Sequence, residues 1–390
     1  EDRQWTYRQF LSLAFSLRCH LRNLEVEPSG GKLAVQMLQS DRTMVVYLAL
    51  YSGRYEFQLV DSHPDGRAFR LSVCPCQALL CESGATPADE PVKTIFVDEL
   101  QLDASFALSE ISVEGHWDDI AFIEYTSGST GRPKSVATMQ WKMAHWIRWR
   151  QFHFPMADSD RVGRNLFFIW YWHIDLCQGG TTVVYPPKFN YDISGLMAYA
   201  RKNSVSWFDC LTPGLILTLL ELEETLPETL TMMISGGEAL PLATCRQWLQ
   251  KWPHCALWNN MATTETAADL SFARITPEMA AMDSLFAPIS DGTICWQNVI
   301  SVVEGELHIR GLNIASGYLP PTVSDRFIVS PDGLQNEYRP GDRAEWRNGY
   351  LFIVGRTDSV VKIRGHRVDL AGVEAMLAGC DEVKDVAFVA

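Results

Sequence analysis

The chain has 390 residues, of which 47% are hydrophobic, 21% charged and 11% aromatic. A chain of this length and composition can bury a large core, and at about 150 residues per domain it predicts two or three globular units. Its 47 acidic and 33 basic side chains leave a net charge of −14. This charge argues against nucleic acid or an anionic membrane surface as the main partner.

No targeting or membrane segment is expected. The apolar stretches at residues 44–51 and 166–172 fall far short of the roughly 20 residues that span a bilayer, and residues 1–7 do not read as a signal peptide. A cytoplasmic protein with reduced cysteines is the default expectation. A zinc site at Cys74, Cys76 and Cys81 is the less favoured alternative, because His63 is the only nearby fourth ligand.

Short apolar runs rich in β-branched residues alternate with longer segments of helical period, which is typical of βαβ units. The predicted fold class is therefore α/β, with a layered body over residues 1–290. Strands are expected at residues 33–37, 55–60, 119–125, 181–185, 206–210, 230–234 and 256–259, and helices at residues 42–52, 141–152, 194–202, 213–224 and 242–251.

The pattern changes after the body to short strands separated by turn residues. Asn348 and Gly349 form a dipeptide that favours a tight hairpin turn. We therefore expect a β-rich subdomain over residues 291–357 and the beginning of an incomplete α+β lobe over residues 358–390. The strands expected here are residues 299–303, 306–310, 344–347, 350–354 and 360–363.

The strongest local motif runs from Thr126 to Lys134, directly after a predicted strand, and reads TSGSTGRPK. Its glycines allow a tight turn with N–H groups pointing inward, its hydroxyls donate hydrogen bonds, and Arg132 and Lys134 add positive charge. This combination suits a polyphosphate. The usual phosphate loop is not matched, because Arg132 follows Gly131, and an ordinary surface turn is the alternative.

This loop resembles the signature of the adenylate-forming enzymes, the superfamily of acyl-CoA synthetases, luciferases and peptide-synthetase adenylation domains. The likeness continues in order through GELHIRG at 305–311, GY at 317–318, YRPGD at 338–342 and GRTDSVVKIRGHRV at 355–368. Together with WTYR at 5–8, the sequences of these motifs are most similar to those of a nonribosomal peptide synthetase adenylation domain. The resemblance implies a body of two α/β sheets, a small β-rich subdomain and a truncated C-terminal lobe.

The resemblance also implies a two-step reaction that uses ATP and Mg²⁺. The carboxylate of an acid attacks the α-phosphorus to give an acyl adenylate and pyrophosphate, and the phosphopantetheine thiol of a carrier-protein domain then displaces AMP. Positioning and charge neutralisation dominate such chemistry. Catalytic roles are expected for Thr126, Lys134 and Glu265, with Glu265 as the Mg²⁺ ligand. The nucleotide-binding residues expected are Thr126, Ser127, Gly128, Ser129, Thr130, Gly131, Lys134, Asn259, Met261, Thr264, Asp342 and Arg356.

Two of these residues match named roles in the family. Asp342 matches the aspartate that accepts hydrogen bonds from the ribose hydroxyls, and Arg356 matches the arginine that approaches the same ribose and phosphate. The chain departs from the family where relatives carry Tyr-Gly before Thr-Glu, since it has Met261 and Ala262 there. Aromatic stacking on the adenine is thus lost or replaced by a thioether contact.

The substrate expectation depends on one aligned position. Relatives that activate amino acids pair the α-ammonium with an aspartate, and alignment on residues 180–182 places Phe167 there. A buried ammonium without a carboxylate is costly, so we expect an α-keto, α-hydroxy, aryl or short branched acid, while Asp269 leaves open an amine elsewhere on it. The expected pocket is Phe167, Phe168, Tyr171, Cys210, Ile234, Gly236, Asn260, Ala268 and Asp269; the alternative is that the aromatic cluster packs a core helix.

The printed sequence ends at Ala390, before the motif that carries the family's lysine. A shortened chain, an undescribed remainder and an inserted methyltransferase or ketoreductase domain are all open explanations. The expected partners are a small carboxylic acid, a carrier-protein domain and, with an insertion, a tailoring domain; nucleic acid and membrane are not expected. A free-standing acid–CoA ligase and a non-catalytic scaffold are the rival functions.

Overall fold

The structure is a computed structural model that describes residues 3–28, 31–85, 92–108, 115–126, 133–165, 169–222, 225–320, 326–358, 360–363, 366–370 and 373. It divides into two compact units. Unit 1 comprises Glu1–Glu124, Ser135–Ala144 and Tyr318–Thr322, and unit 2 comprises Tyr125–Lys134, His145–Gly317 and Val323–Ala390. The division at residues 290 and 357 stays a prediction.

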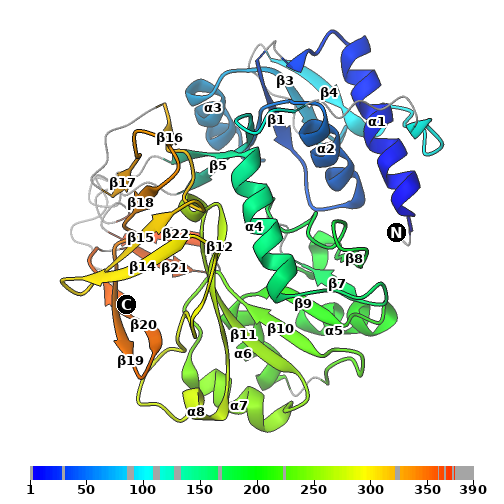
Figure 1. Cartoon of the computed structure of the whole chain (residues 1–390). Coiled ribbons are helices and arrows are strands. Elements are labelled where there is room, and N and C mark those ends of the chain that lie inside the picture. Colours follow the sequence, from blue (N-terminus) through cyan, green and yellow to red (C-terminus); the bar gives the residue numbers. More distant parts are fainter. Residues whose placement is uncertain are drawn as a thin grey trace, which may run out of the picture. The chain divides into compact units, whose positions relative to one another are not determined.

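Unit 1 is built on a seven-stranded sheet with the order β16-β6-β5-β2-β1-β3-β4. Figure 1 labels strands β16, β5, β1, β3 and β4 of this sheet. Strands β1, β2, β3, β4 and β5 run parallel, and β16 pairs antiparallel with β6. The strands are β1 (Lys32–Gln36), β2 (Phe57–Leu59), β3 (Cys76–Cys81), β4 (Lys93–Phe96), β5 (Ile120–Thr126), β6 (Lys134–Met139) and β16 (Tyr318–Leu319). The helices are α1 (Tyr7–Asn23), α2 (Asp41–Ser52) and α3 (Pro64–Val73), with the turn η2 (Val97–Glu99).

The start of α1 shows why a helix forms where the sequence analysis expected none. The Thr6 hydroxyl accepts a hydrogen bond from the Gln9 N–H, and the Gln9 side chain accepts one from the Thr6 N–H. This reciprocal capping satisfies two N–H groups that a helix start leaves free. Phe10, Leu13 and Leu17 follow at helical spacing and are buried, so packing completes the helix.

Unit 2 contains a second seven-stranded sheet, ordered β13-β12-β11-β10-β9-β7-β8. The strands from β11 to β8 are parallel, and β12 and β13 add antiparallel to that edge. Its strands are β7 (Arg161–Arg164), β8 (Thr181–Val184), β9 (Trp207–Leu211), β10 (Met232–Ser235), β11 (Ala256–Thr263), β12 (Ala268–Arg274) and β13 (Thr293–Ile294).

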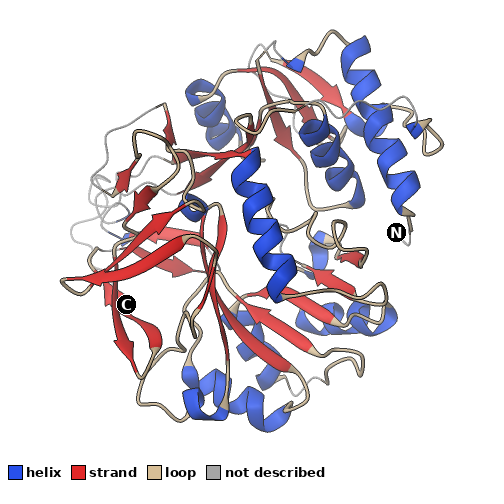
Figure 2. Ribbon diagram, viewed as in Figure 1, coloured by secondary structure: helices blue, strands red, loops and turns tan. Residues whose placement is uncertain are grey.

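Helices cover this second sheet and close its core (Figure 2). Leu196, Ile216 and Trp248, from three successive helices, belong to one buried cluster with Phe208 and Met233 of the sheet. Burial of such side chains supplies about 25 cal/mol per Å² of apolar surface. The helices are α4 (Gln140–His153), α5 (Ile193–Lys202), α6 (Pro213–Glu221), α7 (Leu242–Lys251) and α8 (Pro277–Ala280), with the turns η4 (Pro187–Phe189) and η5 (Thr264–Thr266).

A smaller antiparallel sheet follows in unit 2, as the sequence predicted. It has the order β17-β18-β15-β19-β20, with β14 beside β15, and β21 and β22 form a separate pair. Its strands are β14 (Asn298–Val303), β15 (Glu306–Gly311), β17 (Phe327–Ile328), β18 (Asn336–Tyr338), β19 (Asp342–Arg347) and β20 (Tyr350–Arg356); the pair is β21 (Val360–Ile363) and β22 (His366–Asp369). The predicted α/β class with two sheets and a smaller β-rich part is confirmed.

The cysteines near β3 were the candidates for a zinc site. Cys76 lies on β3, where its sulfur is 2.9 Å from the Gln58 side-chain nitrogen, and burial raises its pKa to about 12. Across the described part of the chain, no group of three or more His, Cys, Asp and Glu side chains is arranged to hold a metal ion. No described helix has the length and apolar character needed to cross a membrane.

Candidate nucleotide and acid site

The phosphate motif joins two neighbouring strands. Strand β5 ends at Thr126 and β6 begins at Lys134, and these strands are adjacent in the sheet. Their seven-residue connection is shorter than the dozen or so residues that a parallel crossover requires, so the pair forms a hairpin. Both Thr126 and Lys134 belong to unit 2. The predicted phosphate ligands Ser127, Gly128, Ser129, Thr130 and Gly131 lie outside the described residues.

The β19–β20 hairpin brings the two predicted ribose residues together. Asn348 and Gly349 have φ angles of 52° and 84°, as the central residues of a type I′ turn require. The register that follows sets Asp342 opposite Arg356. Arg356 donates through Nη1 to the Asp342 carboxylate and through Nη2 to the Pro340 carbonyl, at 2.9 Å for the latter.

Arg356 also contacts Asp358, two residues further along the chain. Its Nε and Nη2 donate to the two carboxylate oxygens of Asp358, at 2.6 and 2.9 Å. Arg326 donates to the same carboxylate at 2.7 Å. A bidentate arginine–carboxylate pair is geometrically demanding and strong, so Arg356 ties Asp342 and Asp358 into one network.

The segment from β11 through η5 to β12 carries the next predicted residues. Asn259 and Met261 are buried on β11, and the Asn259 amide donates to the Pro288 carbonyl at 2.9 Å. Thr264 and Glu265 form the turn that follows, and Glu265 is only 2% exposed. The Glu265 carbonyl accepts from the Ala315 N–H at 2.8 Å, which fixes the backbone that presents this carboxylate.

These residues fit the groups that the family uses. Mg²⁺ prefers oxygen ligands and is usually held by one or two carboxylates together with substrate phosphates. The single buried carboxylate of Glu265 suits this role, and Thr264 adds a neighbouring hydroxyl. Asp342 offers carboxylate oxygens, the acceptor type that ribose hydroxyls need.

Five predicted pocket residues lie side by side in unit 2. The Tyr171 hydroxyl and the Asn260 amide each donate to Asp269 Oδ1 at 2.6 Å. A Cβ atom added to Gly236 would lie 2.9 Å from the Cys210 sulfur and 3.5 Å from the Asn260 Cβ, so these backbones approach closely. Ile234 lies two residues before Gly236 on β10, and Ala268 precedes Asp269 on β12; Phe167 and Phe168 lie outside the described residues.

The sequence analysis missed a buried chain of charges next to these residues. Arg150 donates to Asp269 at 2.5 Å and to Asp209 at 2.7 Å, and Arg164 donates to Asp209 at 2.9 Å and to Asp175 at 2.6 Å. All five side chains are at most 3% exposed. The available signal was Asp209 within the otherwise apolar strand β9, because an isolated charge there requires a buried partner.

The pKa values of the three aspartates in this buried charge network shift in different directions. Burial would raise the pKa of Asp209, but Arg150 and Arg164 outweigh burial and lower it below its usual value. Burial dominates at the two ends and raises the pKa of Asp175 and of Asp269. The central carboxylate is therefore the firmly ionised one, and the ends hold their protons more readily.

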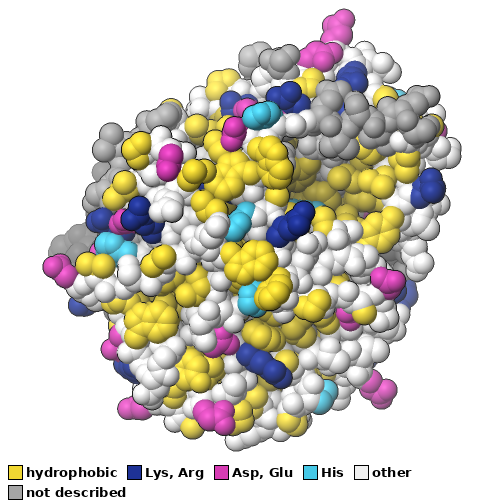
Figure 3. All heavy atoms as spheres, viewed as in Figure 1, with side chains coloured by type: hydrophobic (Ala, Val, Ile, Leu, Met, Phe, Trp, Pro, Cys, Tyr) yellow, Lys and Arg dark blue, Asp and Glu magenta, His cyan; other side chains and the backbone are white. Residues whose placement is uncertain are grey.

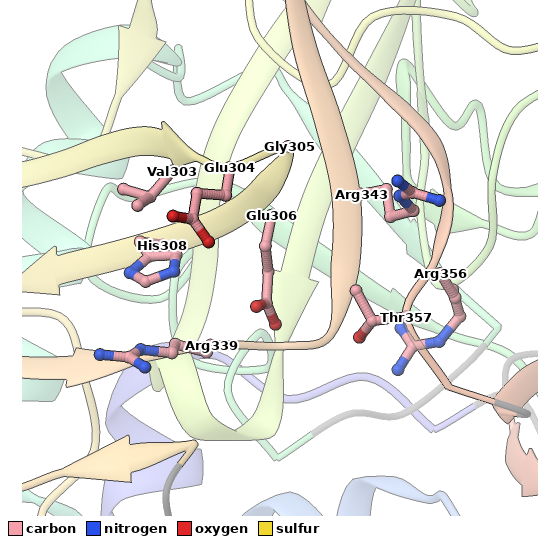
Figure 4. Close-up of a pocket in the computed structure, with 9 residues that line it drawn as sticks. All are labelled: Val303, Glu304, Gly305, Glu306, His308, Arg339, Arg343, Arg356 and Thr357. Carbon is pink, nitrogen blue, oxygen red and sulfur yellow. The ribbon is translucent and has the colours of Figure 1, made fainter.

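A cavity of about 670 Å³ opens among the strands of the smaller sheet (Figure 4). It shares Arg356 with the predicted nucleotide residues. Its lining combines three arginines with two glutamates, so it favours neither sign of charge strongly. The residues that line it are Val303, Glu304, Gly305, Glu306, His308, Arg339, Arg343, Arg356 and Thr357.

Comparisons with known proteins agree with the motifs. A family model described as AMP-binding enzyme matches residues 1–319. Enterobactin synthase component F from Escherichia coli O157:H7 is 27% identical over 412 residues, which cover 98% of this chain and 31% of that protein. Surfactin synthase subunit 2 from Bacillus subtilis (strain 168) is 28% identical over 408 residues, covering 99% and 11%. The chain thus spans less than a third of either relative.

Solved structures share the fold at low identity. An NRPS protein containing adenylation and PCP domains, bound to a vinylsulfonamide inhibitor, matches with a TM-score of 0.81 and 22% identity, covering 98% of this chain and 68% of that one. The o-succinylbenzoate CoA synthetase of Bacillus subtilis gives a TM-score of 0.80 and 20% identity, covering 99% and 80%. The family model spans most of the chain, and the five sequence motifs occur in family order. The chain therefore belongs to the AMP-binding enzyme family.

Proposed function

We propose that this chain activates a carboxylic acid without an α-ammonium group and transfers it to the phosphopantetheine thiol of a carrier domain. The acids that fit are of the α-keto, α-hydroxy, aryl or short branched class, and Asp269 leaves open an amine elsewhere on the acid. In the first step a carboxylate oxygen bonds to the α-phosphorus of ATP and the bond to pyrophosphate breaks. In the second step the thiol sulfur attacks the acyl carbon and AMP leaves.

Each role falls to a side chain that suits it chemically. The Thr126 hydroxyl and the Lys134 ammonium, with the loop between them, hold the β- and γ-phosphates. Asp342 accepts the ribose hydroxyls, and Arg356 beside it offers positive charge to the nucleotide. Glu265 holds Mg²⁺, which neutralises charge on the phosphates when bound.

The observation that carries the proposal is the Asp342–Arg356 pair at the end of the β19–β20 hairpin. A carboxylate left exposed for a sugar needs a fixed orientation, and the arginine supplies it with a charge-assisted hydrogen bond. The Asp342 side chain keeps 13% of its surface exposed, so it remains open to a ligand.

The acid class follows from position 167. Phe167 stands where amino-acid-activating relatives carry the aspartate that pairs with the α-ammonium, and Leu166 and Phe168 beside it are equally uncharged. Burying an ammonium against such side chains costs several kcal/mol.

Pyrophosphate exchange in the full-length protein tests the nucleotide roles. We expect Asp342→Asn and Lys134→Met each to reduce ATP-dependent exchange at least ten-fold, because a lost charged contact is worth roughly 1.4 kcal/mol or more. Asp283→Asn is the matched control, since Asp283 is exposed and belongs to none of the predicted sites. Unchanged exchange in both test variants would reject the assigned roles.

The CoA ligase alternative is supported by the shared fold with o-succinylbenzoate CoA synthetase. It is distinguished by supplying either free CoA or a phosphopantetheinylated carrier domain after adenylate formation. Faster thioester formation on CoA would favour the ligase. Calorimetry with ATP and Mg²⁺ distinguishes both enzymes from the scaffold, which would give no heat and no stabilisation.

A further inference from the structure

The buried chain of charges around Arg150 carries a net negative charge. Its three aspartates and two arginines, with their usual charges, sum to −1. One uncompensated charge in a protein interior costs several kcal/mol. The network therefore favours either an added cation or a bound proton.

Of the three aspartates, and among the residues that the structure describes, Asp269 has the fewest compensating contacts with arginine and other donors besides Tyr171 and Asn260. Asp209, in the middle, is bridged by both arginines. Asp175 at the far end receives two hydrogen bonds from Arg164 and one from the Thr182 hydroxyl, at 2.6, 3.0 and 2.8 Å. Within the described part of the chain, Asp269 has a single arginine contact and otherwise accepts from neutral donors. It is also the aspartate among the predicted acid-pocket residues.

Asn260 provides a second, independent observation. It is 4% exposed, and its Oδ1 has no hydrogen-bond partner among the described residues. Its Nδ2 donates to Asp269 at 2.6 Å, so the unpartnered oxygen lies close to the carboxylate. A buried acceptor without a donor costs about 1–3 kcal/mol, which marks a place where a donor belongs.

A ligand that satisfies both features must donate hydrogen bonds and carry positive charge. A hydroxyl would serve the Asn260 oxygen but leave the network charge at −1. An ammonium has three donors and one positive charge, so it can serve both oxygens and bring the network to neutrality. Tyr171, whose hydroxyl donates to the same carboxylate, would place its aromatic ring near this cation.

We propose that Asp269 and Asn260 together bind an ammonium group that the activated acid carries beyond its α-carbon. The inference rests on the proposed function and names its substrate class: amino acids whose amine is distant from the carboxyl group, on an aliphatic or an aryl framework. It agrees with the uncharged Phe167, because the α-position then carries no ammonium.

Matched acids in the pyrophosphate exchange assay test this inference on the full-length protein. The pairs are 4-(aminomethyl)benzoate with 4-methylbenzoate, 3-aminopropanoate with 3-hydroxypropanoate, and 4-aminobutanoate with 4-hydroxybutanoate. We expect the amino member of the best pair to give at least ten-fold higher kcat/KM. Equal or better use of the neutral members would overturn the inference while leaving the proposed function intact.

Two variants separate recognition from a general change in charge. Asp269→Asn and Asp175→Asn each bring the network to neutrality, but only the first removes the carboxylate near Asn260. We expect Asp269→Asn to abolish the preference for the amine through a raised KM, and Asp175→Asn to keep at least half of the preference on a logarithmic scale. Equal loss in both variants would contradict the inference.

A further variant covers the case in which Asp269→Asn does not fold. Asn260→Leu removes the unpartnered acceptor without changing the charge, and we expect it to reduce the preference at least three-fold. No change in preference would contradict the role of Asn260. If no acid supports exchange, α-keto, α-hydroxy and α-amino acids included, the proposed function fails and this inference fails with it.

Discussion

At the scale of single residues, the ionisable groups of unit 2 differ in what they contribute to stability. Asp209 forms ion pairs with both Arg150 and Arg164. Asp269 forms an ion pair with Arg150 alone of these two arginines. Two carboxylates of the same network are therefore expected to respond differently to neutralisation.

We expect Asp209→Asn to lower the free energy of unfolding by about 3–5 kcal/mol, because it leaves two buried guanidinium groups without their shared carboxylate. Asp269→Asn should cost less than half as much, since it breaks one arginine contact where Asp209→Asn breaks two. Urea denaturation of both variants measures the difference. An equal loss would show that the number of arginine contacts does not decide what each carboxylate contributes to stability.

His173 makes stability depend on pH. Burial and the positive charge of Arg164 lower the pKa of His173 to about 3 from its ordinary 6.5. In the unfolded chain His173 takes up a proton below pH 6.5, whereas in the folded chain it stays neutral, so stability falls as pH drops through this window. The folded side chain packs edge-on against Trp172, with ring centroids 5.0 Å apart.

His173→Phe should therefore flatten the loss of stability on acidification. From pH 7 to pH 5 the wild-type chain should lose about 1–2 kcal/mol more than the variant, because one pKa unit corresponds to about 1.4 kcal/mol. Melting temperatures at the two pH values measure this, with the exposed His254→Phe as the control. If the melting temperature of His173→Phe fell between pH 7 and pH 5 as much as that of the wild type, His173 would not be the source of the pH dependence.

At the scale of elements, the β19–β20 hairpin depends on its turn. Gly349 adopts a φ of 84°, and a Cβ there would meet no atom within 4 Å. The space is free, so a substitution at Gly349 is opposed by backbone strain alone. Because the turn sets the register that pairs Asp342 with Arg356, strain at one end of the hairpin affects the predicted ribose residues at the other.

Gly349→Val should lower the free energy of unfolding by about 1–3 kcal/mol, the usual cost of forcing a β-branched residue to a positive φ. Gly214→Val is the matched control, since Gly214 also has free space but no positive φ, and its effect should stay under about 1 kcal/mol. Hydrogen exchange of the β20 amides measures the local loss. Equal losses of stability in Gly349→Val and Gly214→Val would show that the positive φ at the turn is not the cause.

At the scale of the whole molecule, charge sets which partners the chain attracts. The net charge is −14, and Figure 3 shows basic side chains scattered among acidic and apolar ones on the face that it draws. Nucleic acids bind mainly through clustered lysines and arginines that neutralise phosphates. We expect no mobility shift of duplex DNA at micromolar protein and 150 mM salt. A shift that weakens with added salt would contradict this.

Sequence reasoning succeeded where short-range rules govern the structure. The β19–β20 hairpin follows from Asn348 and Gly349, and the parallel sheets follow from alternating apolar runs and helical periods. Among the elements that it did not predict are β3, whose cysteines also suit a metal site, and α1, whose start is marked by the capping pair Thr6 and Gln9. Local signals for both elements were present.

The sequence by itself determined the family, the α/β class, the order of the motifs and the charge that sets the partners, because these are properties of local pattern and composition. Only the tertiary structure decided that Arg150, Asp209 and Asp269 form one buried network. In the sequence, Asp209 lies 59 positions from Arg150 and Asp269 lies 119 positions from it. Pairing across such separations results from packing of a helix against strands, which periodicity does not encode.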